Sequence, residues 1–121
     1  MLRNFLLVGL GGALGSMLRY AAYYLIKPAS FPLSTFLVNI AGSMLIGIII
    51  GLGMRQSGLS DSWRLFLATG ICGGFTTFSA FSGENLRMFQ DGRYLLSLLY
   101  MSLSVILGIV AAWLGYKLVT N

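Results

Sequence analysis

Residues 73–82 read GGFTTFSAFS and lie inside the third long apolar stretch of this 121-residue chain. They bring together two glycines, two threonines, two serines and three phenylalanines. Irregular or polar backbone survives at membrane depth only against protein or a water-filled cavity, because lipid cannot hydrogen-bond to it. A helix broken at that depth is a recurrent way to build an ion site. The stretch therefore predicts a break in a membrane-spanning helix, with a functional site at the break.

The composition of the whole chain is that of a membrane protein. Hydrophobic residues make up 57% of it and charged residues 9%, which no ordinary soluble domain matches. Four apolar stretches each exceed the roughly 20 residues that a helix needs to cross the hydrocarbon core. They are residues 4–26, 33–54, 63–88 and 94–118. The predicted fold is an all-α integral membrane protein in which residues 1–121 form a single four-helix transmembrane domain.

The eight Lys and Arg residues divide evenly between the two sides of such a bundle. The side of the membrane that carries more loop Lys and Arg sets the orientation of a membrane protein. An even count therefore indicates either a weak charge bias that the count conceals or insertion in both orientations. We favour insertion in both orientations, with two opposed copies paired about a two-fold axis in the membrane plane. The amino-terminal side holds Arg3, Arg55, Arg64 and Lys117; the other holds Lys27, Arg87, Arg93 and, by snorkelling, Arg19.

Polar side chains and glycines recur at helical spacing on the spans. The hydroxyls fit either hydrogen bonding to the carbonyl four residues back or the lining of a polar path. Asn39, with its two donors and one acceptor near the bilayer centre, favours the polar path. The glycines indicate close helix packing. The polar stripes are Thr35, Asn39 and Ser43, and Ser97, Tyr100 and Ser104; the glycines include Gly11, Gly15, Gly47 and Gly51.

Two phenylalanines and two charged residues extend the candidate site. Phe78 and Phe81 share a helical face if helix resumes after the break. Such rings usually fill a core, but their positive edges also suit an anion. Glu84 has a local partner in Arg87, three residues on, and Arg19 lies late in the first span. For Glu84 and Arg19, a vestibule role and a structural role both remain open.

The remaining chemistry is limited by residue types. The chain has one cysteine, Cys72, and no histidine, so neither an intramolecular disulfide nor an ordinary transition-metal site is expected. The carbonyls that the break frees near Gly73 and Thr76 suit a hard cation such as Na⁺. We expect no enzymatic activity and no nucleic-acid partner.

These residues resemble the Fluc (CrcB) family of fluoride channels over the whole chain. Residues 11–15, GGALG, followed by Arg19-Tyr20, are similar to the family's first-helix signature. The second is similar to residues 35–39, TFLVN, with Gly42, and the third to Gly70 with residues 73–81. All three motifs occur in order in a four-span chain.

The resemblance implies a passive channel that exports fluoride from the cytoplasm through the inner (plasma) membrane. It implies an antiparallel dual-topology homodimer with two pores. Carbonyls of Gly73 and Thr76 from both subunits would hold a central structural Na⁺.

The resemblance also assigns the fluoride pore. Phe78 and Phe81 would line it with their ring edges, and Asn39 would contact fluoride. The other pore residues assigned in this way are Thr77, Ser79, Tyr100 and Ser104. Two residues depart from the family pattern: Gly108 stands where some relatives have the next polar residue of the track, and Ala80 replaces the threonine common between the two phenylalanines.

Two other functions fit a short four-span chain. One is a proton-coupled exporter resembling the small multidrug resistance family, which relies on a carboxylate in its first helix. The first span here has no Asp or Glu, and Glu84 lies near the end of the third. The other is a non-transporting assembly protein, which would leave the threonine-rich break unexplained.

Overall fold

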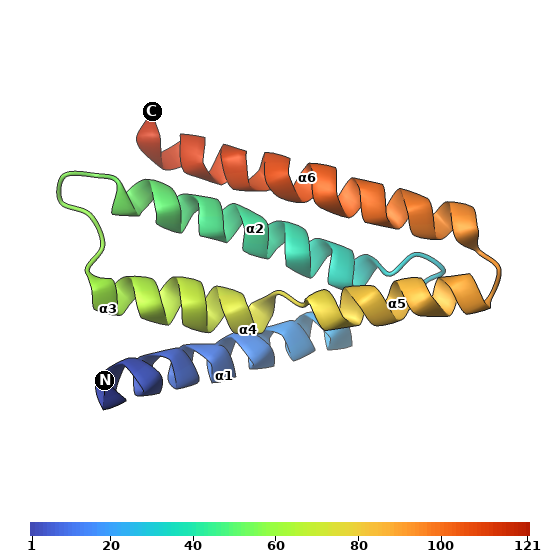
Figure 1. Ribbon diagram of the computed structural model, residues 1–121, viewed down its shortest axis with the longest axis horizontal. Helices are drawn as coiled ribbons and strands as arrows, with labels where there is room; N and C mark the ends of the chain where they lie inside the picture. The colour runs from blue at the N-terminus through green and yellow to red at the C-terminus, as the bar shows by residue number, and fades with distance from the viewer.

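Four membrane-length helices run side by side in the computed structural model, which describes all 121 residues (Figure 1). Three are continuous: α1 (Leu2–Leu25), α2 (Leu33–Gly53) and α6 (Tyr94–Thr120). The third span is divided into α3 (Asp61–Arg64), η1 (Leu65–Cys72), α4 (Gly73–Phe75) and α5 (Phe78–Gln90). The four predicted spans are confirmed, each end within two residues of its predicted position. Both termini lie at the same end of the bundle (Figure 1).

The helices pack in two pairs, α1 with the first half of the third span and α2 with α6. Glycines allow these close approaches, as their spacing predicts. A Cβ atom at Gly15 would overlap the Ile71 carbonyl oxygen, and one at Gly47 would overlap the Ala112 carbonyl oxygen. Gly9 differs, because a Cβ atom there would meet nothing within 4 Å.

The first half of the third span contains a π-helix, η1, which the sequence pattern did not predict. A π-helix is wider than an α-helix and is frequent at functional sites. It runs directly into α4, and the helix then ends at Phe75.

The predicted break is confirmed at Thr76 and Thr77, whose backbones are extended, with ψ of 155° and 114°. Asn39 of α2 replaces the missing helical partners of Thr77. The Thr77 amide donates to Asn39 Oδ1 over 2.9 Å, and Asn39 Nδ2 donates to the Thr77 carbonyl over 3.2 Å. The Thr77 hydroxyl caps α5 by accepting the Ala80 amide at 3.1 Å. Side chains of Asn39 and Thr77 therefore satisfy the backbone groups at the break.

Replacing Asn39 by alanine should destabilise the protein, because it leaves the buried amide and carbonyl of Thr77 without partners. Each unsatisfied group costs roughly 1–3 kcal/mol. We expect a clear fall in the thermal unfolding midpoint of Asn39→Ala in detergent. Ser43→Ala, one turn along the same face of α2, removes a hydroxyl that makes no hydrogen bond within the chain, and should unfold near the wild-type temperature. Equal midpoints for the two variants would contradict the bridging role of Asn39.

Candidate functional site

A cavity of about 470 Å³ lies beside the break, between α2, η1, α5 and α6. Polar and aromatic side chains predicted from separate stretches of sequence meet here. Apolar residues of α2, η1 and α6, among them Ile46, Cys72 and Val105, complete the wall. The polar and aromatic residues of the lining are Asn39, Ser43, Thr76, Thr77, Phe78, Phe81 and Ser104.

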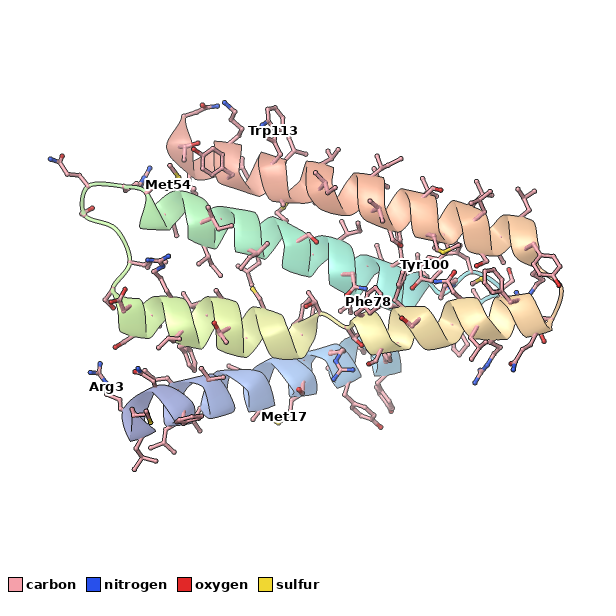
Figure 2. All side chains as sticks on the ribbon, viewed as in Figure 1. Arg3, Met17, Met54, Phe78, Tyr100 and Trp113 are labelled. Atoms are coloured by element: carbon pink, nitrogen blue, oxygen red, sulfur yellow. The ribbon has the colours of Figure 1, made fainter.

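Three aromatic rings run from the bundle surface at the break to its interior. Phe78 is the first residue of α5, beside the break (Figure 2), and it is 78% exposed. Its ring centroid lies 5.8 Å from that of Phe81, as the shared helical face predicts. Phe81 in turn lies 4.9 Å from the ring of Tyr100, which is fully buried. The rings are tilted to one another by 41° and 57°, so ring edges as well as faces are presented along the row.

The buried end of this row joins a chain of hydrogen bonds centred on Glu84. The Tyr100 hydroxyl donates to Glu84 Oε1 over 2.8 Å, and the Thr35 hydroxyl donates to Oε2 over 2.6 Å. The Tyr23 hydroxyl lies 2.6 Å from Thr35 Oγ1. Because the single proton of Thr35 is already directed at Glu84, Tyr23 is the donor in that pair. Both carboxylate oxygens of Glu84 are thus satisfied by hydroxyl donors.

Two expectations about charged residues are wrong. Glu84 forms no ion pair with Arg87; the only ion pairs join Arg64 to Asp61 and Arg93 to Asp91. The carboxylate of Glu84 turns inward to hydroxyl donors, so Arg87 remains unpaired at the surface. Arg19 does not snorkel to the interface. Its Nε donates over 3.1 Å to the carbonyl of Gly74, where a cation complements the negative end of the first half-helix.

The break also frees the two carbonyls that were assigned to a cation. In a continuous helix, the amides of Thr77 and Ala80 would donate to the carbonyls of Gly73 and Thr76. Here those amides donate to Asn39 and to the Thr77 hydroxyl instead. The carbonyl oxygens of Gly73 and Thr76 are therefore left without intrahelical donors. No cluster of three His, Cys, Asp or Glu side chains occurs in the fold.

The remaining predicted pore residues lie at different distances from the cavity. Ser104 lines it, and its hydroxyl is the one buried side-chain polar atom without a hydrogen-bond partner. Tyr100 reaches it only through the ring of Phe81. Ser79 is exposed and does not line the cavity; its hydroxyl lies 3.3 Å from Thr77 Oγ1. A Cβ atom at Gly108 would lie 3.5 Å from Ser43 Oγ, so the polar track beside Gly108 is continued by α2.

Two features were missed by the sequence pattern. Ser97, which was placed on the polar stripe of the fourth span, is fully buried and donates over 2.6 Å to Asn85 Oδ1. Asn85 Nδ2 donates to the Phe81 carbonyl, so the pair ties α5 to α6 rather than lining a path. The second feature is the role of Tyr23 in the hydrogen-bond chain, which the sequence did not predict because a single polar hydroxyl on an apolar helix is the only sign of it.

Comparisons with known proteins agree with the resemblance read from the motifs. A family model described as CrcB-like protein, Camphor Resistance (CrcB), matches residues 6–116. A protein of Flavobacterium psychrophilum named fluoride-specific ion channel FluC is 48% identical over 111 residues, covering 89% of this chain and 90% of its own. The FluC of Thermus thermophilus is 48% identical, covering 97% of this chain and 95% of its own. FluC 1 of Listeria monocytogenes is 43% identical and covers 98% of each chain. The chain belongs to the CrcB family.

Proposed function

We propose that this chain is a passive fluoride channel of the plasma membrane that lets fluoride leave the cytoplasm. Two copies act together as an antiparallel dimer with two pores, each copy contributing residues 1–121 as one transmembrane domain. Its family membership and the names of its relatives support this function. Four helices long and apolar enough to cross a membrane agree with a multi-pass protein.

The cavity at the break carries the proposal, because it offers partial positive charge without a cation in its lining. The unpaired Ser104 hydroxyl has a proton to donate to an anion. The rings of Phe78 and Phe81 add polarised edges. Asn39 Nδ2 uses one of its two protons on Thr77, which leaves the second for an anion. Fluoride holds water strongly, so many weak donors along the path replace its hydration without trapping it.

The proton-coupled exporter is not favoured. Such a protein needs a carboxylate that takes up and releases a proton in each cycle. The first span has no Asp or Glu, and both oxygens of Glu84 accept hydrogen bonds from buried hydroxyls. Glu84 is better suited to ordering Thr35 and Tyr100 than to carrying a proton.

The dimer is supported by what the break exposes. Gly73 and Phe78 lie at the surface of the single subunit, and the Gly73 carbonyl has lost its helical donor. Lipid cannot satisfy a carbonyl at this depth, so a protein surface should cover it. A second, inverted copy would bring the same surface to the same depth. The even division of Lys and Arg supports insertion in both orientations.

A structural Na⁺ at the centre of this dimer fits the residues present. The carbonyls of Gly73 and Thr76 are hard oxygen ligands without intrahelical donors, and two subunits would supply two of each. A monovalent cation bound there would offset the partial negative charge of four carbonyls brought together at the interface.

The aromatic row gives the sharpest test of the pore. Phe78→Ile and, separately, Phe81→Ile should each reduce fluoride efflux from proteoliposomes by about tenfold or more. A tenfold loss of rate corresponds to a loss of about 1.4 kcal/mol of anion stabilisation. An aliphatic chain of similar bulk preserves packing but has no polarised edge. Phe5→Ile, a change of an exposed ring on α1, is the matched control and should keep wild-type flux. Wild-type flux in both well-folded pore variants would leave these rings as packing residues.

Dual insertion can be tested by forcing orientation. Two or three lysines added to the carboxyl terminus should fix one orientation, and the same number in the α1–α2 loop the other. Each variant alone should be inactive, and co-expression of the two should restore fluoride efflux. A variant that is shown by accessibility labelling to insert in one orientation only, and that still transports normally alone, would contradict the antiparallel dimer.

The Na⁺ is expected to stay bound while fluoride passes. Isotopic Na⁺ flux through reconstituted protein should therefore remain at background while fluoride efflux proceeds. The reason is that carbonyls from two subunits would hold the cation between them, whereas the aromatic row lies within each subunit. Na⁺ movement that follows fluoride one for one would replace this proposal with cotransport.

A further inference from the structure

A second cavity, of about 350 Å³, opens at the end of the bundle where the α1–α2 loop meets the α5–α6 loop. Its lining carries three cationic side chains and a single carboxylate. The polar residues that matter here are Tyr23, Lys27, Ser30, Glu84, Arg87 and Arg93. The aromatic row and the site at the break account for none of the three cations.

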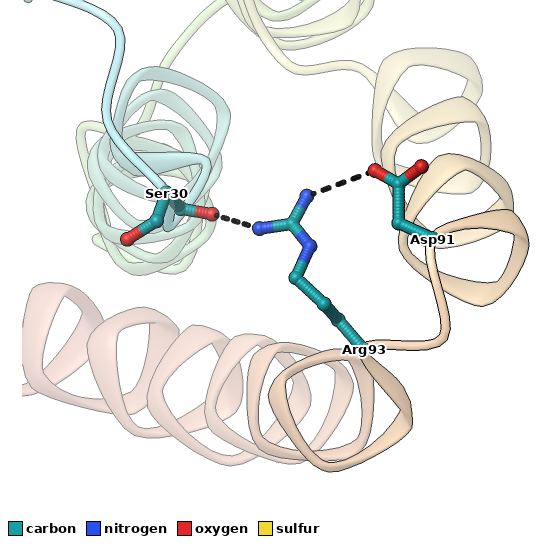
Figure 3. A network of polar contacts seen from close by, with 3 residues as sticks. All are labelled: Ser30, Asp91 and Arg93. Carbon is teal, nitrogen blue, oxygen red and sulfur yellow. Dashed lines mark hydrogen bonds and ion pairs between the residues drawn. The ribbon is translucent and has the colours of Figure 1, made fainter.

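The three cations differ in how far the fold neutralises them. Arg93 donates from Nη1 to the Ser30 carbonyl over 3.0 Å and pairs through Nη2 with Asp91 at 3.5 Å (Figure 3). It thereby ties the two loops together and has a carboxylate beside it. Lys27 and Arg87 are exposed and form no ion pair. Their charge is not balanced by the fold, although Glu84 lies at the inner end of the cavity.

Side chains in contact link this second cavity to the aromatic row. Glu84 lines the cavity and accepts the hydrogen bond of the Tyr100 hydroxyl. The Tyr100 ring lies against Phe81, which lines the cavity at the break. Contacting side chains therefore join the loop end of the bundle to the candidate pore.

We propose that this second cavity is a mouth where small inorganic anions collect before they enter the pore, with Lys27 and Arg87 supplying the attraction and Arg93 fixing the rim. The proposal rests on the function proposed above. Like-charged groups around a cleft raise the local concentration of an oppositely charged ion and its rate of entry. Such attraction does not select fluoride over other small anions, so selection is left to the donors and rings at the break.

The test compares a double variant, Lys27→Gln with Arg87→Gln, with wild type in vesicles of neutral phosphatidylcholine. Fluoride efflux is measured at low fluoride, where entry limits the rate, in two concentrations of potassium glutamate. In about 10 mM salt, where charges act over roughly 30 Å, flux of the double variant should fall by about tenfold. In about 1 M salt, where the range is roughly 3 Å, its flux should match wild type.

Removing two cations from one side of the membrane also biases insertion, so the control removes two from the other side. Arg64→Gln with Lys117→Gln changes the charge balance equally in the opposite direction and touches neither residue of the mouth. This control should keep wild-type flux at both salt concentrations. Equal losses of fluoride flux in both double variants would assign the effect to altered insertion and would contradict the proposed mouth. A loss that appears only in vesicles with added phosphatidylglycerol would assign Lys27 and Arg87 to lipid headgroups and overturn it too.

The outcomes also separate this inference from the proposed function. Wild-type protein that carries no fluoride would end the channel proposal itself. Wild-type protein that carries fluoride, together with a Lys27→Gln, Arg87→Gln variant of unchanged flux in low salt, would end only the proposal of the mouth.

Discussion

The paired hydrogen bonds between Asn39 and Thr77 are the constraint on which the other features of the site depend. A helix cannot stop at membrane depth unless something replaces the donors and acceptors that it abandons. Asn39 offers a donor and an acceptor in the geometry of a peptide group, and so substitutes for one missing turn. Because Asn39 belongs to α2, the same bonds fix the third span against its neighbour. The direction in which α5 leaves the break, and hence the placement of Phe78 and Phe81, follows from this attachment.

The break supplies both partially negative and partially positive groups, because one helix ends there in free carbonyl oxygens and the next helix begins there. The last carbonyls of the first half-helix lose their donors and present negative ends. Arg19 donates to one of them, at Gly74, and the carbonyls of Gly73, Phe75 and Thr76 remain without intrahelical donors. After two extended residues, α5 starts with a hydroxyl cap at Thr77 and with two rings on one face. Acceptors for a cation and weak donors for an anion are thus separated by a few residues of one segment that itself contains no ionisable side chain.

The sequence predicted the spans and the position of the break because hydropathy, length and paired glycines depend only on local chemistry. It predicted the shared face of Phe78 and Phe81 because helical spacing resumes at once. The failures concern which neighbour a side chain meets. Spacing placed Arg87 within reach of Glu84, but hydroxyls from α2 and α6 compete for that carboxylate. Only the packing of three helices decides the competition. The π-helix before the break likewise has no local signature, and it changes the face that each following residue presents.

The two halves of the bundle hold together by different means, and lipid explains the division. Burial of apolar surface does not drive helices together in lipid, so association needs either close backbone contact or polar side chains. Around η1 and along α6, glycines bring backbones into contact. Beyond the break, α5 meets its neighbours through buried polar pairs, Ser97 with Asn85 and Glu84 with Thr35 and Tyr100. Glycine contacts exclude any ion from between the helices, whereas polar pairs hold helices together and still leave hydroxyls that can exchange partners. A path for a small anion is therefore physically compatible with the second half of the bundle, where the inner end of the aromatic row and the proposed mouth lie.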